Sequence, residues 1–431
     1  MNELVILMVV FFIMLILKIP VAYALGLSSL VVIYILGIPL TSAVNSMYNS
    51  INNFPLLAIP LFMLLAQLME AGGITAHLFK VSDAFVGHIR GGLGHVNVFM
   101  SLLFGHLSGS AQADAAGIGS MIIPTMKKSG YPTGFTVAIT ASSSTMGVII
   151  PPSVLMVVYG ATAGVSIGAL FMAGFVPGFL ICFIQMGYTY FMARKYDWPR
   201  GEKHTWKQRG IAVKGALPVL ILPFIIVGGT ASGMFTATES AAIACMFAFA
   251  LIFIMQRNFS LKDIPKIMVN TAMTFSLTMF VVASAGITGW LIAFLGGPQL
   301  VSAWILGITD SFVGVFLLLI LFLLLIGTFL SPITVVIVFM PIIMELGAAA
   351  NINDIHLGII TILTLSLAVV TPPSGTCLMI TANIGGIPLL EAFKHVIPIV
   401  LLTLVLIIAG VIFPELFLFL PRLAVPSAFR A

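Results

Sequence analysis

Two double prolines interrupt apolar stretches of the chain and could expose backbone oxygens for ion binding. They lie in GVIIPPSVLM (147–156) and AVVTPPSGTC (368–377), 221 positions apart. A proline inside a helix removes a backbone hydrogen bond and clashes with the preceding turn, at a cost of about 3 kcal/mol. Carbonyl oxygens freed in this way are costly in lipid, but they can bind a hard cation. The helix that restarts after the break has a partly positive N-terminus, which suits an anion.

A hydroxyl-rich turn precedes each double proline and supplies further oxygen atoms. The turns are GHLSGSAQAD (105–114) and GTFLSPIT (327–334), each between two apolar arms. We expect one turn and one break to form each of two cation sites. The first would contain Ser108, Gly109 and Ser110 with Gly147, Val148 and Ile150, and the second Gly327, Phe329 and Ser331 with Ala368, Val370 and Thr371.

The substrate is expected between the two cation sites. No lysine or arginine lies at this depth, so an anionic substrate would be held by helix ends, hydroxyls and bound Na⁺. Asp114 is an acidic residue within an apolar segment, which makes it a functional candidate. It could equally cap the second arm of its hairpin, and the sequence leaves both roles open. The candidate substrate contacts are Ser110, Ser153, Ser374, Thr376 and Asp114.

The other residues with reactive side chains do not predict an enzyme. The three cysteines lie in separate apolar segments and form no C-x-x-C pair, so neither a disulfide framework nor a metal site is indicated. The seven histidines form no convincing pair of haem ligands, and no H-E-x-x-H sequence occurs. We therefore expect no organic cofactor and no catalytic residue. The net charge of +5 comes from loops and is not a nucleic-acid signal.

The composition places these residues inside a membrane. The 431 residues are 60% hydrophobic and only 7% charged, whereas soluble domains carry about 25% charged residues. Apolar segments long enough to span a bilayer recur along the chain, and the 40 glycines and 23 prolines indicate interrupted, closely packed helices. The N-terminal segment lacks the basic region of a cleavable signal peptide, and we interpret it as the first membrane helix.

Basic residues predict the orientation, because lysine and arginine concentrate on the cytoplasmic side. With the N-terminus outside, loop 72–91, Lys127–Lys128 and the basic linker 194–214 lie inside. Segment 92–126 is too short for two full crossings, which favours a re-entrant hairpin from the cytoplasm. Segment 311–345 would be a second re-entrant hairpin, entering from outside. Sixteen of the eighteen basic residues then lie inside, and Arg422 and Arg430 do not.

The two halves therefore repeat the same order of elements in opposite orientations. Six identities in 27 positions at the 221 spacing support an inverted-topology repeat, a common plan of secondary transporters. The predicted fold is an all-α polytopic membrane protein with two re-entrant hairpins and two broken helices. Its predicted parts are scaffold helices 1–91, first hairpin and broken helix 92–163, scaffold and linker 164–310, second hairpin and broken helix 311–387, and closing helix with C-terminus 388–431.

Several motifs together resemble the large membrane (M) subunit of TRAP transporters, the tripartite ATP-independent periplasmic systems. They are FPLLAIPLFMLLAQLMEAGGI (54–74), GHIRGGLGHVNV (87–98), SGSAQADAAGIGSMIIPTMKKSGY (108–131), GVIIPPSVLMVVYG (147–160), SIGALFMAGFVPG (166–178), GMFTATES (233–240) and TPPSG (371–375).

The resemblance implies an elevator-type transporter of the ion-transporter superfamily in a bacterial inner membrane. Such a subunit imports an organic acid with Na⁺, at two or more Na⁺ sites located at hairpin tips and broken helices. Its implied partners are a small four-helix Q subunit, a periplasmic substrate-binding protein and the membrane lipids.

Three other interpretations remain open from the sequence. A stand-alone sodium–dicarboxylate symporter would share the architecture and would work without a binding protein. A membrane enzyme or redox subunit would need the metal or haem ligands discussed above. A passive channel would not need two cation sites. The substrate also remains open among sialic acid, C4-dicarboxylates and other carboxylates or sulfonates, because hydroxyl and backbone contacts are generic.

Overall fold

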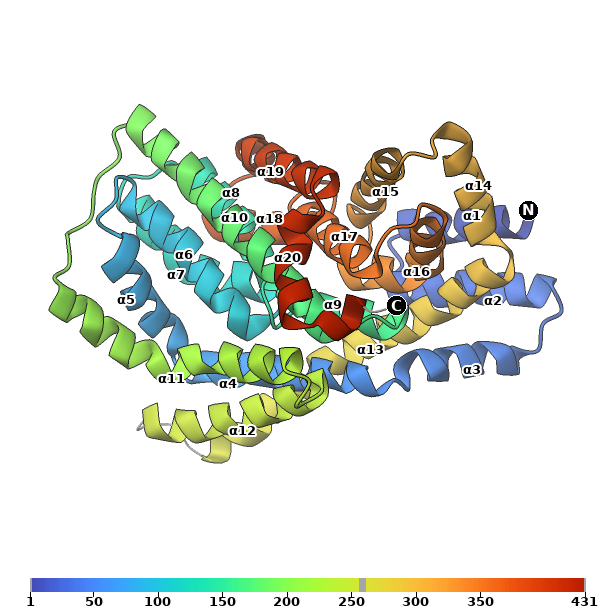
Figure 1. Cartoon of the computed structure of the whole chain (residues 1–431), viewed down its shortest axis with the longest axis horizontal. Helices are drawn as coiled ribbons and strands as arrows, with labels where there is room; N and C mark the ends of the chain where they lie inside the picture. Colours follow the sequence, from blue (N-terminus) through green and yellow to red (C-terminus); the bar gives the residue numbers. More distant parts are fainter. Residues whose placement is uncertain (1, 256–260, 430–431) are drawn as a thin grey trace.

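The computed structural model describes residues 2–255 and 261–429, which form helices joined by turns and, between α10 and α11, by a longer linker (Figure 1). These ranges contain no β-strand, and the all-helical prediction is confirmed. The first half contains α1 (Asn2–Ile16), α2 (Val21–Ile35), α3 (Leu40–Ile51), η1 (Phe54–Leu57), α4 (Ala58–Ala71), α5 (Ile74–Val86), α6 (Gly92–Ser108), α7 (Ala111–Lys128), α8 (Thr133–Ser144), η2 (Thr145–Val148), α9 (Val154–Ala163) and α10 (Ile167–Lys195), where η marks a short 3₁₀ helix. The second half contains α11 (Trp206–Ala231), α12 (Ala237–Met255), η3 (Leu261–Asp263), α13 (Ile264–Phe294), α14 (Gly297–Ile308), α15 (Phe312–Gly327), α16 (Pro332–Ala349), α17 (Asp354–Ala368), α18 (Thr376–Gly385), α19 (Leu389–Ile412), α20 (Glu415–Ala424) and η4 (Pro426–Phe429).

The element order repeats between the two halves. Both ends of α7 and α16 are separated by 221 residues, and so are the first residues of α8 and α17. Ser110 and Ser331, at the same spacing, are the N-caps of α7 and α16, and each side chain accepts a backbone N–H bond. The spacing of 221 residues between the double prolines is therefore shared by whole helices of the two halves, which form a structural repeat.

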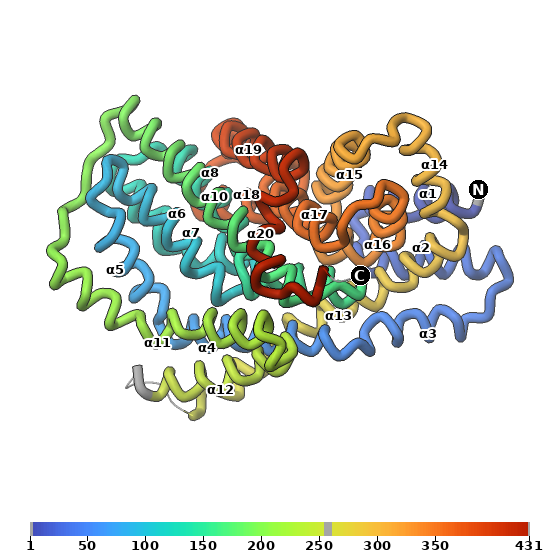
Figure 2. The backbone as a smooth tube through the Cα atoms, viewed as in Figure 1, coloured from blue at the N-terminus to red at the C-terminus, as the bar shows by residue number. Residues whose placement is uncertain are grey.

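The repeats interlock at the centre of the molecule. Helix α18 of the second repeat packs against α7 and α8 of the first, and α19 also packs against α8. Figure 2 shows the orange and red C-terminal segments beside the cyan and green segments of the first repeat. Helices α3, α4, α11 and α12 run along one long edge of the elongated molecule (Figure 1).

Six helical segments among the described residues are long and apolar enough to cross a membrane. Helices α9 and α18, which follow the two double prolines, have only 10 residues each. This is half of the length of about 20 residues that a full crossing needs. The six segments are Phe54–Ala71, Ile167–Lys195, Trp206–Ala231, Leu261–Phe294, Pro332–Ala349 and Leu389–Ile412.

Two segments predicted as loops are largely helical, and these predictions were wrong. Segment 72–91 contains helix α5, which packs against α6 and α11. The linker predicted at 194–214 is helical at both ends, because α10 continues to Lys195 and α11 begins at Trp206. Thr205 and Gln208 form a capping box at the start of α11, a motif that marks helix starts in sequences. Charged residues suggested loops throughout, but Lys80, Lys207 and Lys214 lie on helices, whereas Asp197, Arg200, Glu202 and Lys203 lie in the connection between α10 and α11.

Polar segments that the charge pattern assigned to one side of the membrane lie together. Gly201 N–H donates to Gly87 O at 3.1 Å, and Arg90 pairs with Asp197. His204 Nε2 lies 3.1 Å from Asp83 Oδ2. The linker is therefore attached to the turn between α5 and α6, as expected if both face the same compartment. Arg430 lies outside the described residues.

Candidate functional site

The tip of the first hairpin is a two-residue turn between α6 and α7. Gly109 has φ +60°, a left-handed conformation that glycine adopts without steric cost. Ser110 then caps α7 by accepting a bond from Ala113 N–H. The hydroxyl of Ser108 donates to Oδ1 of Asp114, and the Asp114 side chain is fully buried. The tip thus places the Asp114 carboxylate inside the protein.

The first double proline separates α9 from α8 and η2, as predicted. The peptide bond between Pro151 and Pro152 is cis. Ser153 caps α9 by accepting from Met156 N–H, and its own hydroxyl donates to Val148 O at 2.6 Å. Every residue from 141 to 160 is buried. The interruption is therefore held in a defined shape inside the protein.

The first tip and the first break are in direct contact. Val154 N–H donates to Gly109 O at 3.3 Å. A methyl group on Gly147 would lie 2.3 Å from Oδ2 of Asp114, so only glycine allows this close approach. The same Asp114 oxygen is buried and has no hydrogen-bond partner within the protein. A buried, unpartnered carboxylate oxygen is a costly arrangement, and a cation at this point would compensate it.

The second tip contacts the second break in the corresponding way. Both the N–H and the hydroxyl of Ser374 donate to Thr328 O, the N–H at 3.1 Å. A methyl group on Gly327 would lie 2.7 Å from Cβ of Ala368. The peptide bond between Pro372 and Pro373 is cis. The two groups of residues predicted for the second cation site therefore meet, although Val335 stands at the 221 spacing from Asp114.

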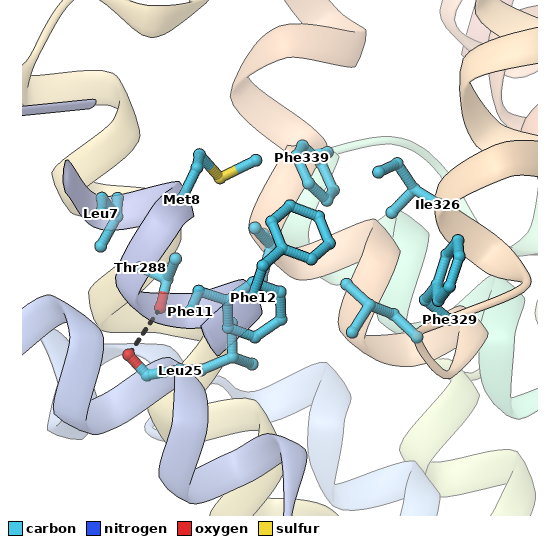
Figure 3. A pocket seen from close by; sticks show the side chains of 11 residues that line it. Leu7, Met8, Phe11, Phe12, Leu25, Thr288, Ile326, Phe329 and Phe339 are labelled. Carbon is cyan, nitrogen blue, oxygen red and sulfur yellow. Dashed lines mark hydrogen bonds between the residues drawn. The ribbon is translucent and has the colours of Figure 1, made fainter. Parts of the chain in front are cut away.

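Phe329 projects away from the second break. Its exposed ring helps to line an apolar pocket beside Phe11 and Phe12 of α1 (Figure 3). This pocket has a volume of only about 10 Å³, which is barely enough for one water. Only the backbone of Phe329 could contribute to a cation site, and its side chain instead lines a pocket that residues of α1 also line.

A hydrogen bond connects the first tip to the second break. Gln112 Nε2 donates to Thr376 Oγ1 at 3.3 Å, and Ser110 Oγ donates to Gln112 Oε1 at 3.3 Å. All three side chains are partly accessible. The structure thus brings two predicted substrate contacts together through Gln112, which the sequence analysis missed. Its position two residues after the capping serine was the available signal.

The other predicted substrate contacts are already engaged within the protein. Ser153 is fully buried and bonded on both sides of the first break, whereas Ser374 joins the second break to Thr328. Val148 O and Gly109 O, two predicted cation ligands, each accept a bond. A carbonyl oxygen has two lone pairs and can accept further. Ser110, Ser374 and Thr376 are all partly accessible, whereas Ser153 and Asp114 are fully buried.

The oxygen atoms at the tips and breaks define the chemistry of the site. Hydroxyl, carbonyl and carboxylate oxygens converge there, the donor set that hard cations prefer. Among residues 2–255 and 261–429, no three His, Cys, Asp or Glu side chains are grouped to hold a metal ion. Oxygen donors of this kind suit a hard cation better than a soft transition metal.

Comparison with solved structures places the fold among membrane transporters. The chain superposes on the YdaH transporter of Alcanivorax borkumensis with a TM-score of 0.61, 13% identity and coverage of 88% of this chain and 89% of that one. It also superposes on MtrF of Neisseria gonorrhoeae with a TM-score of 0.51 and 16% identity, over 88% and 83% of the two chains. At these identities the likeness concerns the fold alone.

The sequence comparisons identify the family. Residues 8–416 match the family described as tripartite ATP-independent periplasmic transporter, DctM component. The chain is 35% identical to the sialic acid TRAP transporter large permease protein SiaM of Vibrio cholerae, over 88% of this chain and 89% of that protein. It is also 35% identical to the C4-dicarboxylate TRAP transporter large permease protein DctM of Pseudomonas aeruginosa, over 87% and 88% of the two chains. The chain therefore belongs to the TRAP transporter large permease family.

Proposed function

We propose that this chain is the membrane subunit of a Na⁺-coupled importer of a carboxylate-bearing organic acid in a bacterial inner membrane. The observation that carries the proposal is the unpartnered Asp114 oxygen beside Gly147, where the first tip meets the first break. A cation bound there would compensate a buried charge, and it would place a positive charge near the substrate. Relatives named as permeases for sialic acid and C4-dicarboxylates support a carboxylate substrate.

Two cation sites flank the proposed substrate site. The first uses Asp114 with the oxygens of the tip 108–110 and the break 147–150. The second uses the tip 327–331 and the break 368–371, where carbonyl and hydroxyl oxygens supply the ligands. The substrate lies between them, against Ser110, Gln112 and Thr376. Its carboxylate would be held by these side chains, by the N-terminus of α18 and by the two cations.

Membership of the TRAP transporter family supports transport by an elevator movement. The moving part would contain both hairpins and both broken helices, which interlock through α7, α8 and α18. The fixed part would contain the helices along the long edge, including α3, α4 and α11. The first hairpin would open to the cytoplasm and the second to the periplasm, with the N-terminus periplasmic. Family membership supports a small four-helix partner subunit and a periplasmic binding protein that delivers the substrate.

Reconstituted uptake tests this function. The chain, its small subunit and its binding protein are placed in proteoliposomes, and uptake of labelled sialic acid or a C4-dicarboxylate is measured with a Na⁺ gradient or a choline gradient. We expect uptake of an organic acid only when both Na⁺ and the binding protein are present. Uptake without the binding protein would identify a stand-alone symporter instead, and Na⁺-independent flux would identify a channel.

Ser110→Ala gives a residue-level test in the same assay. The variant removes one hydroxyl from both the first cation site and the proposed substrate contact, so we expect weaker Na⁺-dependent uptake. Ser120→Ala on the same helix is the matched control, because Ser120 is exposed and bonds only to Gly117 O. Unchanged uptake and Na⁺ dependence in Ser110→Ala would remove Ser110 from the site.

A further inference from the structure

A cavity between α6, α10 and α11 lies outside the proposed transport site. It has a volume of about 640 Å³, within the range of about 300–1,000 Å³ that is typical of small-molecule sites. The three helices pack against one another, and α10 and α11 are each long and apolar enough to cross a membrane. Phe179 of α10 and Phe224 of α11 line the cavity and are 41% and 78% exposed. The cavity therefore opens at the surface of membrane-spanning helices, where apolar molecules dissolved in the bilayer can enter it.

The wall of this cavity is rich in aromatic rings and contains one polar side chain. All three helices contribute phenylalanine, and the four rings belong to Phe99, Phe175, Phe179 and Phe224. Of the described residues that line the cavity, only His106 of α6 has a nitrogen or oxygen atom in its side chain. Its ring lies 6.1 Å from the ring of Phe175, between centroids. The cavity therefore suits a molecule with an aromatic body and a single polar group.

The hydrogen bond of His106 determines which polar group fits. Nδ1 of His106 lies 2.7 Å from Leu102 O, and a carbonyl oxygen can only accept, so Nδ1 carries the proton of this bond. A charged imidazole would be an unpaired ion among apolar side chains, which is strongly unfavourable, so the ring is neutral. In a neutral ring with its proton on Nδ1, the other nitrogen, Nε2, is an acceptor. Because Nδ1 points back to the backbone of α6, Nε2 is on the edge of the ring that a hydrogen-bond donor in the cavity can reach.

We propose that this cavity binds a small membrane-soluble phenol. The aromatic ring of the phenol packs among the phenylalanines, and its hydroxyl donates a hydrogen bond to Nε2 of His106. A phospholipid acyl chain matches the apolar wall but has no donor for Nε2, and an anion would meet an acceptor where it needs a donor. The wall leaves space for an occupant at Gly228 of α11, where an added methyl group would have no atom within 4 Å. The proposal does not depend on the transported substrate or on Na⁺.

Photolabelling of the complete complex in lipid nanodiscs tests the site. The probe is 4-heptylphenol with a diazirine in its alkyl chain, and the labelled peptides are identified by mass spectrometry. We expect labels on α6, α10 and α11 around the cavity. Unlabelled 4-heptylphenol should prevent this labelling at about a fivefold lower concentration in the membrane than its methyl ether, 4-heptylanisole, because the ether lacks the O–H donor. Labels on other helices alone, or equal competition by the two compounds, would overturn the proposal.

Two variants separate the polar contact from the shape of the cavity. His106→Phe keeps an aromatic ring but removes the acceptor, so we expect the phenol and the ether to compete equally in this variant. Gly228→Leu places a side chain in the cavity, so its labelling should be lost. Gly210→Leu on the same helix is the matched control, because Gly210 does not line the cavity and an added methyl group there also has no atom within 4 Å.

Each variant can contradict one part of the proposal. If Gly228→Leu were labelled as strongly as Gly210→Leu, the cavity would not be the binding site. If His106→Phe still bound the phenol about fivefold better than the ether, the hydroxyl would not donate to His106.

Discussion

Asp114 does not cap α7, which was one of the two roles that the sequence left open. It lies in the first turn of α7, where a negative charge is favourable, and its Oδ2 atom faces Gly147 without a partner. Helix capping belongs to Ser110 instead, whose side chain accepts the bond from Ala113 N–H. The carboxylate is therefore available as a cation ligand, and it is the only charged one at either tip.

Asp114→Asn should strongly weaken Na⁺ binding. The amide keeps the shape and can still accept from Ser108, but it loses the negative charge. Interactions with charged groups contribute about 1.5–3 kcal/mol, so the half-saturating Na⁺ concentration should rise at least about tenfold. The measurement is uptake as a function of Na⁺ at a saturating concentration of binding protein and substrate. An Asn variant with wild-type Na⁺ dependence would contradict a role for the carboxylate in the site.

Predicted site residues that are close together in the chain also lie together in the structure. Ser108, Ser110 and Asp114 are within seven positions and were found from the turn alone. Gln112 was missed because its partner Thr376 is 264 positions away, and no local pattern connects them. Phe329 was assigned with its neighbours in the second turn, but its side chain lies on the other side of the backbone, toward α1.

At the scale of elements, the close contact of α6 with the first break positions the first site. A methyl group on Gly105 would lie 3.1 Å from Cα of Gly147, a distance at which backbone would have to move. These two glycines thus let the hairpin arm approach the 3₁₀ turn η2 directly, as small residues do between membrane helices. The Asp114 carboxylate, on the second arm α7, can then reach Gly147 at the first break.

Gly105→Ala should separate these two elements. Alanine stabilises a helix relative to glycine by about 1 kcal/mol, but overpacking against fixed backbone costs about 1–3 kcal/mol. We expect a lower melting temperature and weaker Na⁺-dependent uptake. Gly117→Ala is the matched control, because its added methyl would lie 3.8 Å from the Phe104 ring in ordinary contact. Equal behaviour of the two variants would show that the close contact is unimportant.

The interrupted helices were predictable because proline acts locally. The expected breaks at 147–153 and 368–374 agree with the turns after η2 and α17. Helices α5 and α14 were missed for an equally local reason. They are shorter and more amphipathic than a membrane span, so a search for long apolar segments passes over them.

At the scale of the whole molecule, one hydrogen bond joins the proposed fixed and moving parts at the end of α9. Asn53 Nδ2, just before η1, donates to Ala161 O at 3.2 Å. A cavity of about 410 Å³ lies beside it, between the α9–α10 turn and the α11–α12 turn. An elevator movement would have to break this contact, because the two sides would slide past each other.

Joining these two sides should stop transport. Cysteines at Asn53 and Ala161, bridged by a short bismaleimide, would join α9 to the proposed fixed part. We therefore expect uptake to fall to background. The natural cysteines at positions 182, 245 and 377 are buried, which limits side reactions. Each single-cysteine variant treated with the same reagent is the control. Full uptake by the bridged protein would contradict relative movement at this contact.

Composition and charge predicted the membrane environment and the repeat, but not how the repeats pack. Nothing in the sequence shows that α18 packs against α7 and α8, because none of these helices has a sharply defined apolar face. The relative position of distant helices depends on the complementary shapes of many small side chains. These side chains are spread over the whole chain, so no short sequence motif identifies how the helices pack.

The interlocked packing also restricts how the protein can be made. Synthesis proceeds from the N-terminus, yet α7 and α8 receive their covering partners only when residues of α18 and α19 have left the ribosome. Until then the polar tip with Asp114 and the first proline break lack the neighbours that the second repeat contributes. Biogenesis must therefore keep an unfinished first repeat soluble in lipid, and truncation before residue 376 should yield a product that cells degrade.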